Sequence, residues 1–203
     1  MDNELLVRFK TIMVLRAIFL TGFVAIIIAF ERSATRQTPI LPLSAVLCTA
    51  YFLVLAYALF LRFRMRVQTL GWIQALGDLF VVTGLIFTTG GIESPLSFLF
   101  MFAIIGASVM LPRGAAYKVA GVASALYGLL VDLEYFRVLQ PVYFFPQPTV
   151  PYQGAYLFSI VTMNLASFFA VAFLSSILSD RLRLVKEELE KKSFNLRKLE
   201  AFH

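Results

Sequence analysis

The stretch from Leu70 to Thr88 reads LGWIQALGDLFVVTGLIFT, and it decides the class of fold. Asp78 is its only ionisable residue. An apolar run of this length matches what a helix needs to cross the roughly 30 Å hydrocarbon core of a bilayer. Backbone N–H and C=O groups in hydrocarbon must find partners within their own segment, so the run predicts a transmembrane helix.

The rest of the chain repeats this composition. Of the 203 residues, 60% are hydrophobic and 15% are charged, whereas a soluble domain has about 25% charged residues. Six helices of about 20 residues each account for the apolar content. We therefore predict an all-α membrane protein with six transmembrane helices. The predicted spans are residues 11–30, 43–61, 70–88, 95–111, 115–131 and 156–178.

The first span has two interpretations. Arg8 and Lys10 precede it and Arg16 interrupts it, a pattern that also occurs in signal peptides. No convincing small-x-small cleavage site follows, and the long side chain of Arg16 can extend to the membrane interface. We expect the segment to be retained as a span.

Lysine and arginine set the predicted orientation, because they concentrate on the cytoplasmic side of membrane proteins. Fourteen of the 18 lie on one side of the six spans, in the amino-terminal segment, the second and fourth loops and the tail. The other side has Arg32, Arg36 and Arg137. Both termini are therefore predicted to be cytoplasmic. The net charge of +6 reflects topology and contact with anionic lipid headgroups, and we predict no nucleic-acid partner.

The segments on the outer side are short. The longest, residues 132–155, holds four of the eight prolines and is too small for an independent domain. We expect Cys48, the only cysteine, to be a small packing residue. We predict no metal and no cofactor, and a stimulus that is read by the short loops or within the bilayer.

Polar side chains inside the membrane are costly and mark candidate functional positions. Asp78 is the clearest, and Gln74 lies one turn before it on the same face. Counted along the helices, Asp78 and Arg16 lie at comparable depths. Three interpretations of Arg16 and Asp78 stay open. They form a structural ion pair, they have a sensing or ligand-contacting role, or each side chain extends independently to the membrane–water interface.

Smaller polar and apolar groups suggest helix packing. Asn164 and Ser167 face the same way in the sixth span, where hydrogen bonding between helices is their ordinary role. We interpret the small residues of the fifth span as packing or dimer contacts. They form the rows Ala120–Ser124–Gly128 and Gly121–Ala125.

The loop between the third and fourth spans reads TTGGIESP over residues 88–95. Gly90 and Gly91 permit a tight reversal, and Glu93 or Ser94 can cap a helix that begins near Pro95. The loop is interpreted either as a turn or as a ligand contact at the outer face. It lacks the lysine and the preceding strand of a phosphate-binding P-loop.

Beyond Leu178 the apolar residues follow the 3-4 spacing of a coiled coil. The seam consists of Leu182, Val185, Leu189, Lys192, Leu196, Leu199 and His203. We predict a helix that continues the sixth span and pairs as a parallel homodimer; a surface-bound amphipathic helix is the alternative. Arg181 of one copy and Lys186 of the other would face each other, and the repulsion between these like charges would weaken the pair. A weak coiled coil can switch between packings.

The seam reaches His203 without any residue that ends a helix, so we expect the natural sequence to continue. His203 is interpreted as an ordinary linker residue. The chain thus divides into a six-helix sensor domain over residues 1–178 and a coiled-coil linker over residues 179–203.

Four segments together resemble the amino-terminal six-span sensor module of bacterial histidine kinases, in particular the type IV pilus sensor kinase and its nitrogen-regulation-like relatives. They are Gln74–Asp78 (QALGD), Thr89–Leu96 (TGGIESPL), Ala107–Arg113 (ASVMLPR) and Leu196–His203 (LRKLEAFH). The resemblance implies a homodimeric kinase of the bacterial inner membrane that autophosphorylates a histidine and passes the phosphate to a response regulator.

The resemblance assigns no catalytic residue to this chain. Its last segment resembles the linker that leads into a PAS domain and then the kinase core. In the pilus-sensing relatives the membrane module is thought to read another transmembrane protein, and Gln74 or Asp78 could do so here.

Two other functions compete with this one. A small six-helix transporter or channel would explain the buried polar groups but not the heptads, and no inverted repeats are evident. A membrane enzyme is disfavoured, because a serine hydrolase needs a histidine partner and a metalloenzyme needs a cluster of ligands.

Overall fold

The computed structural model describes residues 40–62, 67–139 and 154–201, together with helical positions 11, 14, 18, 21, 22 and 25. Within these ranges the side chains of residues 40, 61, 62, 67, 190 and 194–201 are outside the description. The described residues form helices and turns without any strand, so the predicted all-α class is confirmed. The elements are α2 (Ile40–Arg62), α3 (Val67–Thr88), the 3₁₀ turns η1 (Gly91–Glu93) and η2 (Pro95–Phe98), α4 (Leu99–Met110), α5 (Ala115–Tyr135) and α6 (Gly154–Ala201).

Four of the described helices are long and apolar enough to cross a membrane: Leu41–Phe60, Gln68–Thr88, Ala115–Tyr135 and Gly154–Ser193. They coincide with four of the predicted spans. The segment Pro95–Met110 is a shorter apolar helix at the fourth predicted span, and the first predicted span lies largely outside the described residues. The protein is therefore a multi-pass membrane protein.

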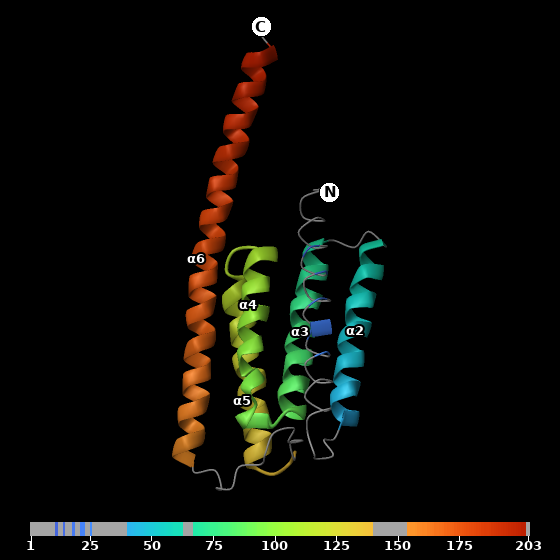
Figure 1. The fold of residues 1–203 in the computed structure, drawn as a ribbon. Helices are drawn as coiled ribbons and strands as arrows, with labels where there is room; N and C mark the ends of the chain where they lie inside the picture. The colour runs from blue at the N-terminus through green and yellow to red at the C-terminus, as the bar shows by residue number, and fades with distance from the viewer. Residues whose placement is uncertain are drawn as a thin grey trace.

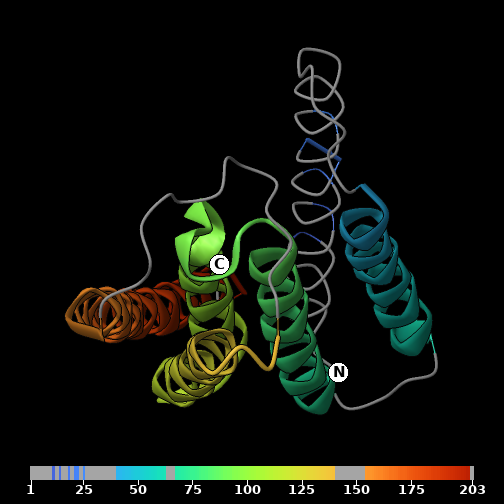
Figure 2. The ribbon, with the colours of Figure 1, turned by 90° about the horizontal axis from the view of Figure 1, so that it is seen from below.

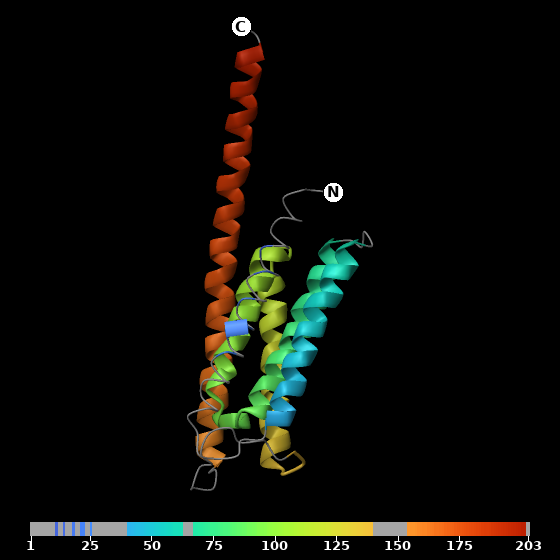
Figure 3. The same cartoon turned by 45° about the vertical axis from the view of Figure 1, so that its right-hand side comes forward.

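Consecutive helices from α2 to α6 run in alternating directions (Figures 1 and 3). We call the end of the bundle from which the last part of α6 projects the tail end, and the opposite end, which holds the turn between α3 and α4, the turn end. Seen along the bundle, α2 and α6 lie on opposite sides with α3, α4 and α5 between them (Figure 2). The middle of the bundle is thus formed by α3, α4 and α5.

The core lies between these three helices and is closed by α6. Leu79 and Ile86 of α3, Phe100 and Ile104 of α4, and Phe168 of α6 are all completely buried. α2 packs mainly against α3 and presents much of its surface to the surroundings. Cys48 lies on α2 and is exposed. The prediction that Cys48 is a small packing residue is wrong, because Cys48 lies on an exposed side of α2, away from the packing of α2 against α3.

The described helices differ from two of the predicted spans in detail. The fourth span begins at Pro95, as predicted, but its first four residues form the 3₁₀ turn η2 before the α-helix α4. The fifth helix does not end at Val131 but continues to Tyr135, so Glu134 belongs to its last turn and not to a loop. The charge at position 134 is tolerated there because its carboxylate accepts a backbone hydrogen bond from Ile92.

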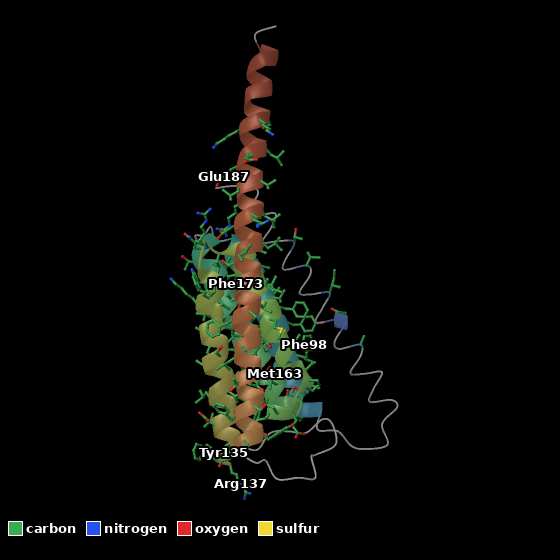
Figure 4. All side chains as sticks on the ribbon, turned by 90° about the vertical axis from the view of Figure 1, so that its left-hand side faces the viewer. Phe98, Tyr135, Arg137, Met163, Phe173 and Glu187 are labelled. Carbon is green, nitrogen blue, oxygen red and sulfur yellow. The ribbon has the colours of Figure 1, made fainter. Side chains whose placement is uncertain are left out.

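The sixth span and the tail form one helix of 48 residues, α6. Its last part leaves the bundle, with Glu187 well beyond the ends of the other helices (Figure 4). The predicted continuity of the sixth span with the tail is confirmed over the described backbone.

Candidate functional site

A network of hydroxyl groups forms the turn between α3 and α4. Gly90 and Gly91 have φ angles of 131° and 61°, which disfavour any residue with a Cβ, so both glycines are required by the turn. Thr89 Oγ1 donates to the carbonyl of Leu85 at 2.6 Å and lies 2.6 Å from Ser94 Oγ. Because a hydroxyl has one proton, Ser94 must then donate to Thr89.

Ser94 is also the cap of the element that follows. Its Oγ accepts a hydrogen bond from the backbone N–H of Leu96 at 3.2 Å, whereas Glu93 is exposed. Of the two predicted caps, Ser94 is therefore the one that the structure uses.

Glu134 ties this turn to α5. Its Oε2 accepts a hydrogen bond from the backbone N–H of Ile92 at 2.9 Å. Ile92 itself is buried, so the bond lies at the edge of the core. A displacement of the α3–α4 turn must therefore either move the end of α5 or break this bond.

The intramembrane polar residues of α3 differ in their surroundings. Gln74 is 1% exposed, and neither its amide nitrogen nor its amide oxygen has a hydrogen-bond partner among the described residues. Asp78 is half-buried. Between them, Gly77 lies directly under the hydroxyl of Tyr57 from α2. Arg16 is outside the described residues, so the Arg16–Asp78 ion pair stays a prediction.

Asn164 connects α6 to α5 in the middle of the bundle. Its Nδ2 donates to the hydroxyl of Tyr127 at 3.2 Å and to the carbonyl of Ile160 at 3.0 Å. The predicted hydrogen bond between helices is confirmed for Asn164. It is wrong for Ser167, whose Oγ donates to the carbonyl of Met163 in its own helix at 2.8 Å.

Three aromatic rings pack beside this bond, one from each of α4, α5 and α6. The ring of Phe168 lies 5.3 Å from that of Phe100 and 6.0 Å from that of Tyr127, both edge to face. Phe100 and Tyr127 lie 6.3 Å apart, also edge to face. All three side chains are buried. We call Phe100, Tyr127 and Phe168 the aromatic triad.

A second polar cluster joins α4 to α6 at the tail end of the bundle. Ser108 Oγ lies 2.7 Å from the carbonyl oxygen of Ser175 and 2.9 Å from Ser179 Oγ. Ser179 Oγ donates to the carbonyl of Ser108 at 2.9 Å. Arg183 Nη2 donates to the carbonyls of Ser108 at 3.4 Å and Leu111 at 2.5 Å.

Arg183 thereby satisfies carbonyls at the carboxyl end of α4, where a cation is also favoured by the helix dipole. One ion pair lies beside this cluster, between Arg113 Nε and Asp180 Oδ1 at 3.1 Å. Both of its side chains are exposed, so it contributes little. In the described part of the chain, no three His, Cys, Asp or Glu side chains gather to hold a metal ion.

The rows of small residues on α5 face different surroundings. Ala120 is completely buried in the core. A Cβ added to Gly121 or Gly128 would meet no heavy atom within 4 Å, so both glycines face open space. Their role as dimer contacts stays a prediction.

The predicted coiled-coil seam lies on the part of α6 that leaves the bundle. Leu182, Val185 and Leu189 are 59%, 55% and 62% exposed. Leu196 and Leu199 lie in the helical backbone, but their side chains are outside the described residues. The described part of the seam is therefore uncovered within a single chain.

The family model of the PilS-like transmembrane domain matches residues 4–189. The chain belongs to this family. The resemblance to the pilus sensor kinase module is thereby confirmed, and every cluster described above lies within the matched part of this PilS-like domain. Membership suggests a membrane sensor module of a histidine kinase. No curated protein matches the chain, and neither does any solved structure.

Several residues of the PilS-like domain that join its helices were missed by the sequence reasoning. Ser175, Ser179 and Arg183 recur every four positions on one face of α6, and this spacing was the available signal. Ser108 lies inside the segment ASVMLPR, but nothing in its sequence indicates its partners on α6. The triad residue Phe168 is one of 21 phenylalanines and gives no signal of its own.

Proposed function

We propose that this chain is the sensor and dimerisation module of a two-component histidine kinase, and that it passes a stimulus through α6 to a cytoplasmic output domain. The observation that carries the proposal is α6 itself, which is one helix from the bundle core to Ala201. A continuous helix transmits rotation, tilt or translation over its length, because its backbone hydrogen bonds keep it stiff.

The proposal includes six spans with both termini in the cytoplasm of a bacterium and the module in its inner membrane. The distribution of lysine and arginine supports this orientation. Four helices of spanning length, the shorter α4 and the helical positions between Thr11 and Ala25 support the number of spans. The chain itself would be no enzyme; phosphotransfer to a response regulator would belong to a kinase core that it does not contain.

The proposed active form is a parallel homodimer paired through the tail of α6. Leu182, Val185 and Leu189 support this pairing, because three large apolar side chains that project beyond the bundle are more stable when covered. Both copies of α6 leave the membrane in the same direction, so the two tails are parallel. Arg181 and Lys186 keep the pair weak enough to change its packing.

The proposed stimulus acts at the turn end or within the bilayer, for example through another transmembrane protein. Gln74 cannot meet such a partner in this arrangement, because it is 1% exposed. Asp78 is half-buried and remains the intramembrane candidate. The Gly90–Gly91 turn is the candidate at the membrane surface, because Glu134 connects it to α5.

A transporter or channel is the competing function. The described helices α2 and α3 form a groove of about 400 Å³ on the flank of the bundle. The lining includes Val46, Leu53, Phe80 and Val81, and the hydroxyl of its Thr49 is bonded to the carbonyl of Ala45. Such a lining suits hydrocarbon better than a polar substrate.

The decisive experiment joins the chain to a reporter kinase core and inserts residues after Leu189. An insertion of seven residues keeps the heptad phase, whereas an insertion of four rotates everything beyond it. We expect kinase output to survive the first and to change at least several-fold with the second. Output that is the same for both insertions would contradict signal transfer through a stiff helix.

Cysteine cross-linking tests the dimer separately. In a Cys48→Ala background, Leu182→Cys and Leu189→Cys should each link two chains in membranes. Leu184→Cys is the matched control, because Leu184 is similarly exposed at 51% but lies off the seam. Equal linking at all three positions, or none at any, would contradict the proposed seam.

A further inference from the structure

The half of α6 nearest the tail is held to the bundle without large buried side chains. After Phe168, only Ala172 and Ser179 are buried among the described side chains of α6. The large apolar residues in this half face outward: Phe169, Phe173, Leu174, Ile177 and Leu178. Figure 4 shows Phe173 on the outer face of α6.

Burial of apolar surface drives little association between helices within a bilayer, because lipid tails are as apolar as the side chains. Hydrogen bonds and close packing of small residues decide such contacts instead. At the tail end, these are the hydrogen bonds among Ser108, Ser179 and Arg183. This half of α6 is therefore fixed mainly by one polar cluster.

The bonds in this cluster are of a kind that can exchange. Ser108 has one hydroxyl proton and two acceptors, the carbonyl of Ser175 at 2.7 Å and Ser179 Oγ at 2.9 Å. Arg183 lies close to the end of the bundle, so its guanidinium can trade the α4 carbonyls for water or lipid headgroups when α6 moves away.

The other half of α6 is held differently. Phe168 is completely buried in the aromatic triad, and Asn164 is bonded to Tyr127 one turn away. Removing Phe168 from the triad would leave a cavity between three helices. The free-energy cost of this change is much larger than that of exchanging hydrogen bonds. α6 thus has a firm attachment in mid-bundle and an exchangeable one at the tail end.

We propose that Ser108, Ser179 and Arg183 form a releasable latch, and that α6 pivots about Phe168 when the latch opens. The proposal deepens the sensor function and rests on it, because it assigns the step that sets the position of the output helix. In the closed state α6 lies against the carboxyl end of α4, as the structure shows. In the open state the half of α6 nearest the tail tilts away from α4, while the aromatic triad stays packed.

The geometry amplifies the movement. At 1.5 Å per residue, Ser179 lies about 16 Å and Leu189 about 32 Å from Phe168 along the helix. A displacement of about 2 Å at the latch, enough to break its hydrogen bonds, therefore becomes about 4 Å at Leu189. A shift of that size changes which side chains of a paired tail can meet.

Distance measurement between two spin labels tests the latch. The labels are attached through Tyr117→Cys on α5 and Glu188→Cys on the tail in a Cys48→Ala chain; both native side chains are exposed. The labelled chain is reconstituted in bilayers with excess unlabelled chain, so that distances within one chain dominate. Combining Arg183→Gln with Ser179→Ala should raise the population of a second, longer distance at least fivefold.

Neighbouring residues on the same helix provide matched controls. Arg181→Gln removes the same charge from an exposed position, and Ser176→Ala removes a hydroxyl that makes no hydrogen bond among the described residues. Both should leave the distance distribution unchanged. Arg183→Lys, which keeps the charge but loses the planar guanidinium, should give an intermediate population. If the Gln/Ala variant fails to fold, Arg183→Lys decides the test by itself.

A second readout uses the latch itself. In the Cys48→Ala chain, Ser108→Cys and Ser179→Cys should form a disulfide when a thiol oxidant is added, because Arg183 still holds α6 against α4; adding Arg183→Gln should slow its formation at least fivefold. The proposal would be overturned if both the rate of disulfide formation and the distance distribution stayed unchanged. It would also be overturned if the Gln/Ala variant only broadened the distance distribution, to the extent seen with Arg181→Gln. Neither measurement needs a kinase core or a dimer, so failure of the latch is distinguishable from failure of the proposed function.

Discussion

The substitution Gly77→Ala tests why the motif QALGD carries a glycine. A Cβ built at Gly77 overlaps the hydroxyl oxygen of Tyr57, whereas the next atoms, Tyr57 Cζ and Leu53 Cδ1, lie at the ordinary contact distances of 3.4 and 3.7 Å. Only the hydroxyl obstructs the new methyl group. Tyr57 is 2% exposed, so its ring has little room to move aside.

The expected cost follows from two opposing effects. Overpacking of this kind costs about 1–3 kcal/mol, while alanine is favoured over glycine in a helix by about 1 kcal/mol. We therefore expect Gly77→Ala to lower the free energy of unfolding by up to about 2 kcal/mol. In a Tyr57→Phe background the obstruction is gone, and the same change should stabilise the protein by up to about 1 kcal/mol. The coupling between the two substitutions is then about 2 kcal/mol.

The assay is denaturant unfolding of the purified chain in mixed micelles, applied to the four members of this double-mutant cycle. Gly121→Ala is the control, because a Cβ there meets nothing within 4 Å and only the gain in helix propensity remains. Strictly additive effects of Gly77→Ala and Tyr57→Phe would refute the reasoning. So would equal effects of alanine at positions 77 and 121.

Three further substitutions probe the contacts between helices. Phe168→Ala should lower the free energy of unfolding by about 3–5 kcal/mol through the cavity it leaves, whereas Phe169→Ala, at a 45% exposed site, should cost far less in the same assay. Glu134→Ala should cost about 1–3 kcal/mol by leaving a buried backbone N–H without its acceptor, and amide hydrogen exchange should accelerate at that N–H; Glu93→Ala, at an exposed site, should change neither. Asn164→Leu should cost about 0.5–2 kcal/mol, the range for a hydrogen bond between membrane helices, by thermal denaturation.

The elements of this fold were accessible from the sequence because the bilayer imposes one rule on every span. Leu70–Thr88 had to be a helix once it was placed in hydrocarbon, and the structure has α3 there. The turn could also be predicted, because paired glycines permit a tight reversal and a serine before proline can cap the element that follows. Gly90 and Gly91 do take positive φ angles, and Ser94 does cap the turn after it.

Apart from the bond of Asn164, the contacts between helices could not be predicted from the sequence, because they depend on the rotation and depth of each helix. A serine such as Ser167 can bond within its own helix or across to another, and the choice depends on which face meets a neighbour. Glu134 was assigned to a loop because a charge usually marks the end of a span. Its partner, the N–H of Ile92, lies 42 positions away in the sequence, and no local pattern connects the two.

The shortness of α4 explains why the clusters at the two ends of the bundle belong together. With 12 α-helical residues preceded by the four of η2, it extends about 26 Å, less than the roughly 30 Å of a hydrocarbon core. Backbone groups at both of its ends therefore approach hydrocarbon and need partners from elsewhere. Just before η2, the carboxylate of Glu134 on α5 accepts a hydrogen bond from the N–H of Ile92. Just after α4 ends, Arg183 of α6 donates a hydrogen bond to the carbonyl of Leu111. Under the proposed function, a pull on the turn would be carried along α4, which is a stiff helix, to the carbonyls that hold α6. The same deficit in length thus accounts for the bonds at both ends of α4, and under the proposed function it would make α4 the mechanical link between the turn and α6.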